Sequence, residues 1–361
     1  MRILGTTISV LALSATVAGA GGLDRSGQGI GVIFETGNYV ELSFGSVTPT
    51  VSGTYVGGTQ SSGNIGSSYT QLGFGYTNSI NDNLSFSLIF DQPYGAVVSY
   101  PATGTFAALV GTQAEFTSSA ITAMARYKLN SNVSIYGGVK SQTVAMTVAV
   151  PALAYTANGE ATQAFGYVIG AAYEIPDIAL RAALTYHSAT SHDIPTFETQ
   201  GAFTGNSVTN VKMPQAVNLD FQTGIAADTL LTAGIRWANW TQTVIDPARY
   251  LAVTGGPIQS YSEDVFTYSL GVGRRFTENF AGSVTLGYER PQGGVTGNLA
   301  PTDGFQSISV GGAYTMDNIE ISGGVRYVKI GDATSSGLGG ANGTFSGNSV
   351  IGIGFKVGVT F

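Results

Sequence analysis

The chain ends in Ile351-Gly352-Ile353-Gly354-Phe355-Lys356-Val357-Gly358-Val359-Thr360-Phe361. Every odd-numbered position in this stretch is apolar, and every even-numbered position is Gly, Lys or Thr. Because side chains of a β-strand alternate between two faces, the pattern predicts a strand with one apolar face and one small or polar face. A strand of a soluble sandwich can show the same alternation. A strand that ends on an aromatic residue is more typical of the closing strand of an outer-membrane β-barrel, with lipid outside and a polar lumen inside.

The composition favours the barrel. Charged residues make up only 10% of the 361 residues, against about 25% in a typical soluble protein. Beyond the N-terminus, no apolar run reaches the roughly 20 residues that a membrane-spanning helix needs. The chain has no cysteine, which excludes disulfides and thiolate metal sites. The net charge of −7, without a basic patch, argues against nucleic acid as a partner. We expect no metal and no cofactor.

The first twenty residues have the features of a secretory signal peptide. Arg2 supplies a positive charge, residues 3–17 form a short apolar core, and Ala18-Gly19-Ala20 matches a cleavage site. The alternative is a membrane anchor, but the apolar core is too short for one. We therefore predict a signal peptide over residues 1–20, a short luminal segment over residues 21–37 and a barrel over residues 38–361.

Alternating segments recur along the rest of the chain. Short turns rich in Asn and Asp alternate with long loops rich in Gly, Ser and Thr, as expected for a barrel with periplasmic turns and extracellular loops. The predicted fold is therefore all-β, a transmembrane antiparallel β-barrel of about fourteen strands with a short N-terminal segment in its lumen. The predicted strands span residues 38–47, 69–78, 84–91, 115–128, 133–147, 162–174, 178–188, 212–226, 230–241, 264–276, 280–289, 304–315, 319–330 and 349–361.

The free energy of placing a charged side chain in the membrane decides which face of each strand points outward. A charged side chain at the bilayer midplane costs about 2–4 kcal/mol in such barrels, so the apolar face should point outward. Five aromatic side chains near the short turns are then predicted to form a girdle at the membrane interface: Tyr76, Tyr127, Tyr173, Tyr314 and Phe276.

The opposite face brings charges of both signs into the lumen. The predicted inward positions include Arg126, Lys128, Lys140, Arg181, His187, Asp220, Arg236, Arg275, Glu289, Glu320 and Arg326. One interpretation is a solvated wall whose charges pair with one another. The other is that some of the cations hold an anionic head group, because the guanidinium fork matches a carboxylate. The candidates for ligand binding are Arg181, Arg236, Arg326 and Lys140.

Two predicted loops are unusually apolar. One contains Phe106 and Leu109, and the other contains Val150, Leu153 and Tyr155. Exposed apolar patches often mark a binding surface, so these residues are candidates for capturing a hydrophobic ligand. A loop that packs inward over the barrel mouth would have the same sequence.

Several segments resemble the FadL/TodX family of outer-membrane transporters, and the resemblance covers nearly the whole chain after residue 20. The segments are Gly22-Leu23-Asp24-Arg25-Ser26-Gly27-Gln28-Gly29, Asp91-Gln92-Pro93-Tyr94-Gly95 and, after Lys212-Met213-Pro214, Ile235-Arg236-Trp237-Ala238-Asn239-Trp240-Thr241. The last is similar to the family's tryptophan-x-aspartate-tryptophan-serine segment, with Asn239 in place of the acid. The family's barrels also have fourteen strands.

This resemblance implies passive transport of hydrophobic small molecules, such as long-chain fatty acids or other apolar and aromatic compounds. The family's lumen is plugged by an N-terminal hatch, and its substrate leaves sideways at a kink in the third strand. Here Asp91 and Pro93 would mark that lateral opening, because proline breaks a ladder hydrogen bond. Alternatively, Pro93 simply starts a loop.

The hatch is where this chain departs from the family. Only about seventeen residues lie between Gly21 and the first predicted strand, and the family's Asn-Pro-Ala element is missing. Asp24 and Arg25 are candidates for anchoring this short hatch to luminal charges. The resemblance further implies a monomer in the outer membrane of a Gram-negative bacterium, with membrane lipid and the assembly machinery as partners and Phe361 as the assembly signal.

Three other functions are compatible with parts of the sequence. A barrel hydrolase would use the cluster around His187 and His192, which contains Ser188, Ser191 and Asp193, but no Gly-x-Ser-x-Gly elbow is present. A general diffusion porin would need an open aqueous lumen with segregated charge, which the low charge content disfavours. Adhesion through the outer loops is a third alternative. We predict that the chain is not an enzyme and has no catalytic residues.

Overall fold

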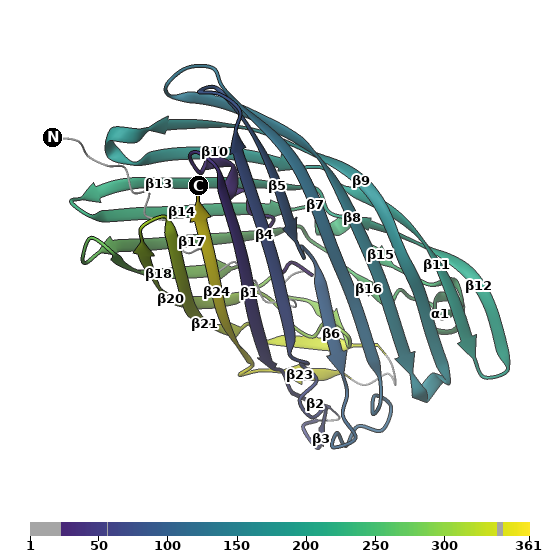
Figure 1. The fold of residues 1–361 in the computed structure, drawn as a ribbon. Helices are drawn as coiled ribbons and strands as arrows, with labels where there is room; N and C mark the ends of the chain where they lie inside the picture. The colour runs from purple at the N-terminus through teal and green to yellow at the C-terminus, as the bar shows by residue number, and fades with distance from the viewer. Residues whose placement is uncertain (1–22, 56, 338–341) are drawn as a thin grey trace.

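A computed structural model describes residues 23–55, 57–337 and 342–361, and the predicted signal peptide lies outside them. Fourteen antiparallel wall strands close into a barrel (Figure 1), which confirms the predicted fold. The wall strands are β1 (Tyr39–Thr50), β4 (Tyr69–Ser79), β5 (Leu84–Asp91), β7 (Gln113–Lys128), β8 (Val133–Val150), β9 (Tyr155–Ile175), β10 (Leu180–His187), β13 (Ala216–Ala226), β14 (Thr229–Ala238), β17 (Val265–Arg275), β18 (Phe280–Glu289), β20 (Phe305–Met316), β21 (Ile319–Ile330) and β24 (Ser349–Thr360).

The barrel closes between its first and last strands. β1 and β24 pair along their full lengths, from Tyr39 opposite Thr360 to Thr50 opposite Ser349. Beyond the last pair, the Phe361 N–H donates to the Asn38 carbonyl at 2.8 Å. Inside the lumen, Lys356 of β24 pairs with Glu41 of β1 at 3.1 Å. The predicted closure is therefore confirmed, and the end of the barrel where Asn38 and Phe361 meet is called the terminal rim below.

One long predicted loop was wrong. Residues between the seventh and eighth wall strands form a hairpin of β11 (Thr190–Gln200) and β12 (Phe203–Met213), which extends the wall beyond β10 and β13. β11 pairs with the first part of β9, so β9 also begins earlier than predicted. Polar residues occupy both faces of this hairpin, so the apolar alternation that marks the wall strands is absent. The strand predicted over 212–226 is split at Pro214, because β12 ends at Met213 and β13 begins at Ala216.

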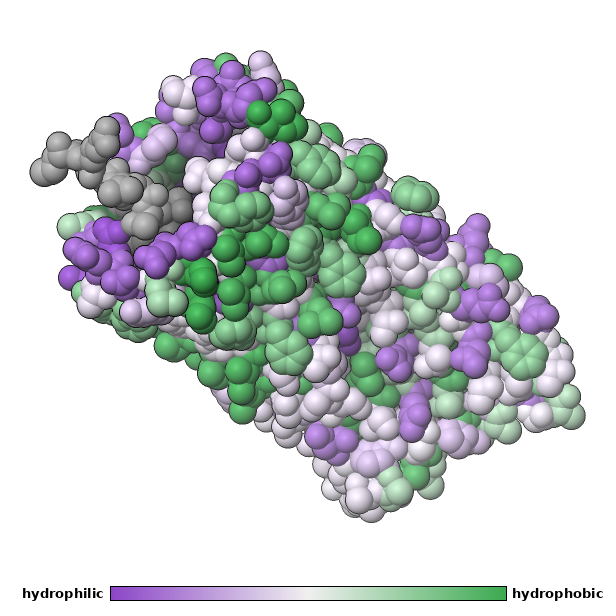
Figure 2. All heavy atoms as spheres, viewed as in Figure 1, coloured by the Kyte–Doolittle hydropathy of each residue, from purple (hydrophilic) through white to green (hydrophobic). Residues whose placement is uncertain are grey.

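The outer wall near the terminal rim is apolar, as predicted. Leu72, Leu270 and Ile353 are about half exposed on this surface, at 52%, 52% and 57%. Figure 2 shows the hydrophobic side chains gathered over the half of the barrel near the chain ends, while the other half is more hydrophilic. The predicted girdle residues Tyr127, Tyr173, Tyr314 and Phe276 are exposed, and Tyr76 is half-buried. Such a belt suits a low-dielectric environment around the wall.

The long connections gather at the opposite end of the barrel, called the loop end (Figure 1). Five short strands form a small sheet there: β2 (Gly53–Tyr55), β3 (Gln60–Ser61), β19 (Val295–Gly297), β22 (Ala333–Ser336) and β23 (Gly343–Phe345). The other short elements are β6 (Gly95–Ser99), β15 (Val244–Ile245), β16 (Gln259–Ser260), α1 (Ala248–Thr254) and the 3-10 turns η1 (Gly31–Phe34), η2 (Pro151–Leu153), η3 (Pro176–Ile178) and η4 (Trp240–Gln242). Among the described residues, no helix is long and apolar enough to cross a membrane.

Candidate functional site

The third wall strand is interrupted. β5 ends at Asp91, opposite Ala120 of β7, and β6 resumes at Gly95, opposite Thr117 of the same strand. The intervening residues include Pro93, which has no N–H to donate to a ladder. Because the strand resumes after three residues, Pro93 does not start a loop, and the wall is kinked rather than ended.

The kink opens a break between β4 and the third wall strand. Backbone pairing between β4 and β5 runs only from Phe74 to Ser79, and β6 pairs with β7 alone among the described strands. Across the unpaired part, Gln92 supplies the contacts: its Oε1 accepts from the Leu72 N–H at 2.9 Å, and its carbonyl accepts from Gln71 Nε2 at 3.4 Å. Beyond it, a single bridge between Gly66 and Val98 rejoins the wall. A side chain therefore closes this part of the wall where a ladder would normally do so.

Residues 23–37 form a plug inside the barrel, and its beginning bonds to the kink. The Arg25 N–H donates to the Pro93 carbonyl at 2.8 Å, and the Gly95 N–H donates to the Leu23 carbonyl at 2.8 Å. Ser26 Oγ donates to Asp91 Oδ2 at 2.5 Å. Backbone groups released by the wall break are thus satisfied by the plug, as buried polar groups require.

Arg236 of β14 holds the plug. Its Nε and Nη2 donate to the two carboxylate oxygens of Asp24 at 3.1 and 2.8 Å, a bidentate pair. Its Nη1 donates to Asn218 Oδ1 at 2.9 Å, while Asn218 Nδ2 donates to the Gly27 carbonyl at 2.9 Å. The guanidinium fork that was predicted to bind a ligand head group is therefore occupied by the plug in this structure. The Asp24 contact is the one expected of a hatch anchor.

The middle of the plug is apolar. Val32, Ile33 and Phe34 of η1 are buried in a cluster with Met124, Tyr136 and other luminal side chains. The guanidinium groups of Arg126 and Arg181 lie over the Phe34 ring, 4.7 and 4.3 Å from its centroid. Cations stack favourably on aromatic faces, so these two arginines clamp the plug. The plug is therefore packed against the inner wall through the bulky apolar side chains of η1.

The other predicted ligand-binding cations are not gathered into one site. Arg181 donates to Gln222 Oε1 at 3.0 Å beside the plug, whereas Arg326 donates to Ser307 Oγ at 2.9 Å on the far wall. Lys140 is 2% exposed and donates to the Ser188 carbonyl at 3.3 Å. Each of these cations has a protein partner, which favours the first of the two interpretations, a luminal wall of mutually bonded groups.

Some predicted luminal charges lie at the rim instead. Lys128 is exposed, and Arg275 forms an ion pair with Asp228 in the short turn before β14. Both residues sit in the last positions of their strands, where alternation no longer decides which medium a long side chain reaches.

Arg25 differs from the other luminal cations. The residue is 4% exposed, and its Cζ lies 3.9 Å from the centroid of the Tyr69 ring. Its Nε and Nη2 have no hydrogen-bond partner among the described residues. Burial lowers the pKa of the guanidinium from its usual value. Of the two predicted hatch anchors, only Asp24 therefore binds a luminal charge, and Arg25 is held through its backbone.

The apolar loop residues pack inward. Phe106, Leu109, Val150 and Tyr155 are buried in one large cluster at the loop end, and Leu153 packs against it. Phe106 stacks on Tyr55 with ring centroids 4.4 Å apart. Of the two explanations offered by the sequence, the structure therefore has the loops closing the barrel mouth.

A row of three aromatic side chains in contact, which was not predicted, joins this cluster to the plug. Tyr94, at the kink, lies edge-on to Trp240 at 5.5 Å, and Trp240 lies 5.0 Å from Tyr261. Tyr94 Oη also donates to Gln28 Oε1 at 3.2 Å. The sequence signal was present, because Tyr94 and Trp240 belong to the two segments with family resemblance. Their contact depends on tertiary structure.

Neither ring nitrogen of His192 bonds to a Ser hydroxyl or to a carboxylate among the described residues. His192 contacts the Thr162 carbonyl at 3.0 Å through Nδ1 and Thr190 Oγ1 at 3.1 Å through Nε2. Asp193 follows it on the same strand, so its side chain points to the opposite face, where it is exposed and accepts from Asn210. Among the described residues, no three His, Asp or Glu side chains are grouped to hold a metal ion.

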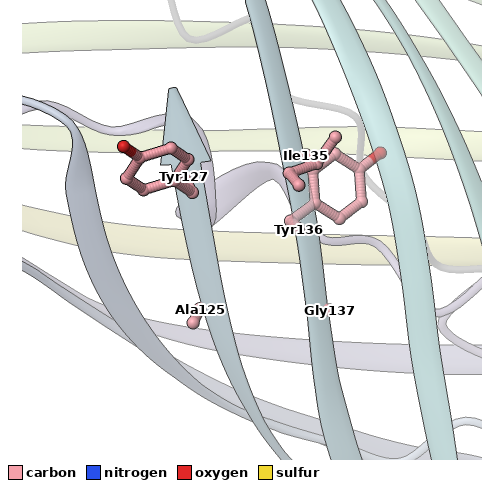
Figure 3. Close-up of a pocket in the computed structure, with 5 residues that line it drawn as sticks. All are labelled: Ala125, Tyr127, Ile135, Tyr136 and Gly137. Atoms are coloured by element: carbon pink, nitrogen blue, oxygen red, sulfur yellow. The ribbon is translucent and has the colours of Figure 1, made fainter. Parts of the chain in front are cut away.

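A shallow groove of about 320 Å³ lies between β7 and β8. It is lined by Ala125 and Tyr127 from one strand and Ile135, Tyr136 and Gly137 from the next (Figure 3). Ala125 and Gly137 are paired across the strands, and a methyl group opposite a glycine leaves room on the outer wall. Tyr127 and Ile135 are exposed on the outer surface, which places the groove outside the lumen.

Comparison with solved structures finds proteins of similar architecture. A Pseudomonas aeruginosa FadL homologue superposes with a TM-score of 0.76 and 15% identity, covering 91% of this chain and 92% of that one. The fold is that of the FadL and TodX transporters. The Pseudomonas putida toluene transporter TodX gives 0.66 and 11%, covering 96% and 97%, and the monoaromatic hydrocarbon channel CymD gives 0.60 and 12%, covering 91% and 90%. No family model and no curated protein sequence matches the chain. Within this FadL/TodX fold, the kinked third wall strand and the luminal plug are the features that distinguish the barrel from a simple pore.

Proposed function

We propose that this protein transports hydrophobic small molecules passively across the outer membrane of a Gram-negative bacterium. The observation that supports this most strongly is the break between β4 and the third wall strand, set in an apolar outer wall and closed by Gln92. A hydrophobic molecule that leaves through such a break avoids water, where its transfer is unfavourable by about 0.8 kcal/mol per methylene. Asp91 and Pro93 frame the proposed exit. Long-chain fatty acids and aromatic compounds are the proposed substrates.

The path begins at the loop end. The buried cluster with Phe106, Leu109, Val150, Leu153 and Tyr155 would part to admit an apolar solute, which then meets the plug and is turned toward the wall break. The protein's part is limited to binding and guiding, without a chemical step, a metal or a cofactor. It would act as a monomer surrounded by outer-membrane lipid, after insertion by the assembly machinery.

Uptake in a transporter-deleted host tests the proposal. Cells that express the protein should gain uptake of labelled fatty acid or toluene. A matched variant with Gln92→Cys and Leu72→Cys would place two thiols across the wall break, and its oxidation should block uptake while reduction restores it. If the variant inserts correctly but oxidation leaves uptake unchanged, the lateral route is wrong. If the unmodified protein restores no uptake of either compound, the transport function is wrong.

A general diffusion porin is the second candidate. Such a protein needs a continuous aqueous lumen, whereas the described plug and loop residues bury two clusters of apolar side chains inside this barrel. Planar-bilayer recording separates the two, because a large steady ion current would support the porin and contradict the proposed hydrophobic route.

A further inference from the structure

We infer that Arg25 is a carboxylate-binding site at the wall break, and that it makes the exit respond to hydrophobic anions more than to neutral hydrocarbons. This inference rests on the proposed transport function and specifies its substrate class. It starts from a buried guanidinium, two of whose nitrogens have no hydrogen-bond partner among the described residues.

The position of Arg25 couples the plug to the break. Its backbone N–H bonds to the Pro93 carbonyl, and its guanidinium lies between the Tyr69 ring on β4 and Gly95 on β6. A Cβ on Gly95 would come within 2.5 Å of the Arg25 Cζ, so the absence of a side chain there makes room for the guanidinium. The two strands that Arg25 touches are those that fail to pair with each other.

The two unpartnered nitrogens define the ligand. Nε and Nη2 lie on one edge of the guanidinium plane, the edge that can donate two parallel hydrogen bonds to a carboxylate. Arg236 uses the same two atoms in this way for Asp24, the residue next to Arg25. At Arg25 this edge has no hydrogen-bond partner among the described residues. The Tyr69 ring lies against the guanidinium, and the charge of Glu115 acts on it without a hydrogen bond or an ion pair.

The chain itself supplies no carboxylate for this edge. Arg25 is in none of the ion pairs seen among the described residues, which join Arg126, Arg236, Arg275 and Lys356 to carboxylates. The residues outside the described ranges contain no Asp or Glu. Burying the donor edge of a guanidinium without a bonded anion is unfavourable, so an arriving carboxylate would gain a strong, charge-assisted partner.

In this arrangement the charge of the ligand influences whether the wall break opens. A ligand shifts a conformational equilibrium only by its differential affinity for the two states. In this structure the guanidinium lies against the Tyr69 ring, between β4 and β6. A carboxylate that draws Arg25 away from Tyr69 binds the open state better, whereas a neutral molecule of the same length has no such preference.

Equilibrium binding to the purified, detergent-solubilised protein tests the inference. The probes are radiolabelled hexadecanoate and hexadecan-1-ol, which share chain length but differ in charge. The unmodified protein should bind hexadecanoate on the order of 10- to 100-fold more tightly, the factor expected from hydrogen bonds between charged groups. Arg25→Met, which keeps length and apolar contact, should abolish this ratio and leave the hexadecan-1-ol affinity unchanged. Arg274→Met, at an exposed arginine near the terminal rim, is the matched control and should keep the ratio.

A second variant guards against misfolding of the first. Gly95→Ala retains the charge but displaces the guanidinium, and should reduce the ratio by roughly the same factor. A ratio that survives both substitutions, or an equal loss of both probes, overturns the inference. Equal binding of the two probes by the unmodified protein also overturns it but leaves the transport function standing, whereas binding of neither probe counts against the transport function itself.

Discussion

The Asp24–Arg236 pair offers the most direct test of how the plug is held. Replacing Asp24 with Asn keeps the size of the side chain but removes its charge, which leaves the guanidinium of Arg236 without its anion. The two side chains are 20% and 11% exposed, so the pair is largely withdrawn from solvent. Breaking a buried pair from one side costs about 3–5 kcal/mol, and the residual exposure favours the lower limit, about 3 kcal/mol. Since 1.4 kcal/mol is a factor of ten, the undocked plug should become about 100-fold more populated.

Hydrogen exchange read by mass spectrometry measures this population directly. Exchange of amides in residues 23–37 should accelerate about 100-fold in Asp24→Asn, while the wall strands exchange as before, because their ladders do not depend on the plug. The control is Asp228→Asn, which removes the partner of Arg275 from a half-exposed pair at the rim and should change stability by less than about 1 kcal/mol. Unchanged exchange of the plug in Asp24→Asn, or equal effects of the two variants, would refute the anchoring role of Asp24.

Three further predictions use other parts of the barrel. Deleting Phe361 removes one hydrogen bond to Asn38, which contributes only about 1 kcal/mol to stability. We expect a severe loss of outer-membrane insertion nevertheless, because the assembly machinery would no longer recognise the last strand. Normal assembly of the deletion variant, measured by heat-modifiable migration, would disprove that role. Gln92→Ala removes the side-chain closure of the wall break and should speed uptake up to about fivefold, the factor for about 1 kcal/mol; uptake that is equal to or slower than that of the unmodified protein speaks against exit at this point. His192→Ala should leave uptake and ester turnover unchanged, and an esterase activity lost with His192 would reinstate the hydrolase.

The period-two alternation predicted the wall strands well because a single physical effect, the exclusion of polar side chains from an apolar medium, determines which face of each strand points outward. Leu72 and Ile353 face outward for the same reason, the cost of polarity in an apolar medium, and that reason acts on each strand separately. Where this effect is absent, the prediction failed, as in the β11–β12 hairpin, whose two faces are both polar. The start of β9 was misplaced for the same reason, whereas the strand predicted over 212–226 is split at Pro214.

The candidate site could be predicted only in part, because its contacts join distant positions. Pro93 was a candidate for the kink only through the family resemblance, beside the alternative that it starts a loop. The break also depends on the missing ladder to β4 and on the orientation of Gln92. Asp24 and Arg236 were both singled out, one as an anchor and the other as a ligand-binding group. They are 212 residues apart in sequence, and nothing local indicates that they bind each other. Arg25 shows the opposite case, in which the expected ion pair is missing.

The ion pair between Glu41 and Lys356 has a consequence for how the barrel is sealed. The first and last wall strands must find each other after the whole chain has been delivered, and several registers could compete. A slip of one residue would turn Lys356 toward lipid, at a cost of about 2–4 kcal/mol, and would strand Glu41 in the lumen. The pair of charges on β1 and β24 therefore selects the correct register at closure, because a barrel that closes in a shifted register is less stable from the moment it forms.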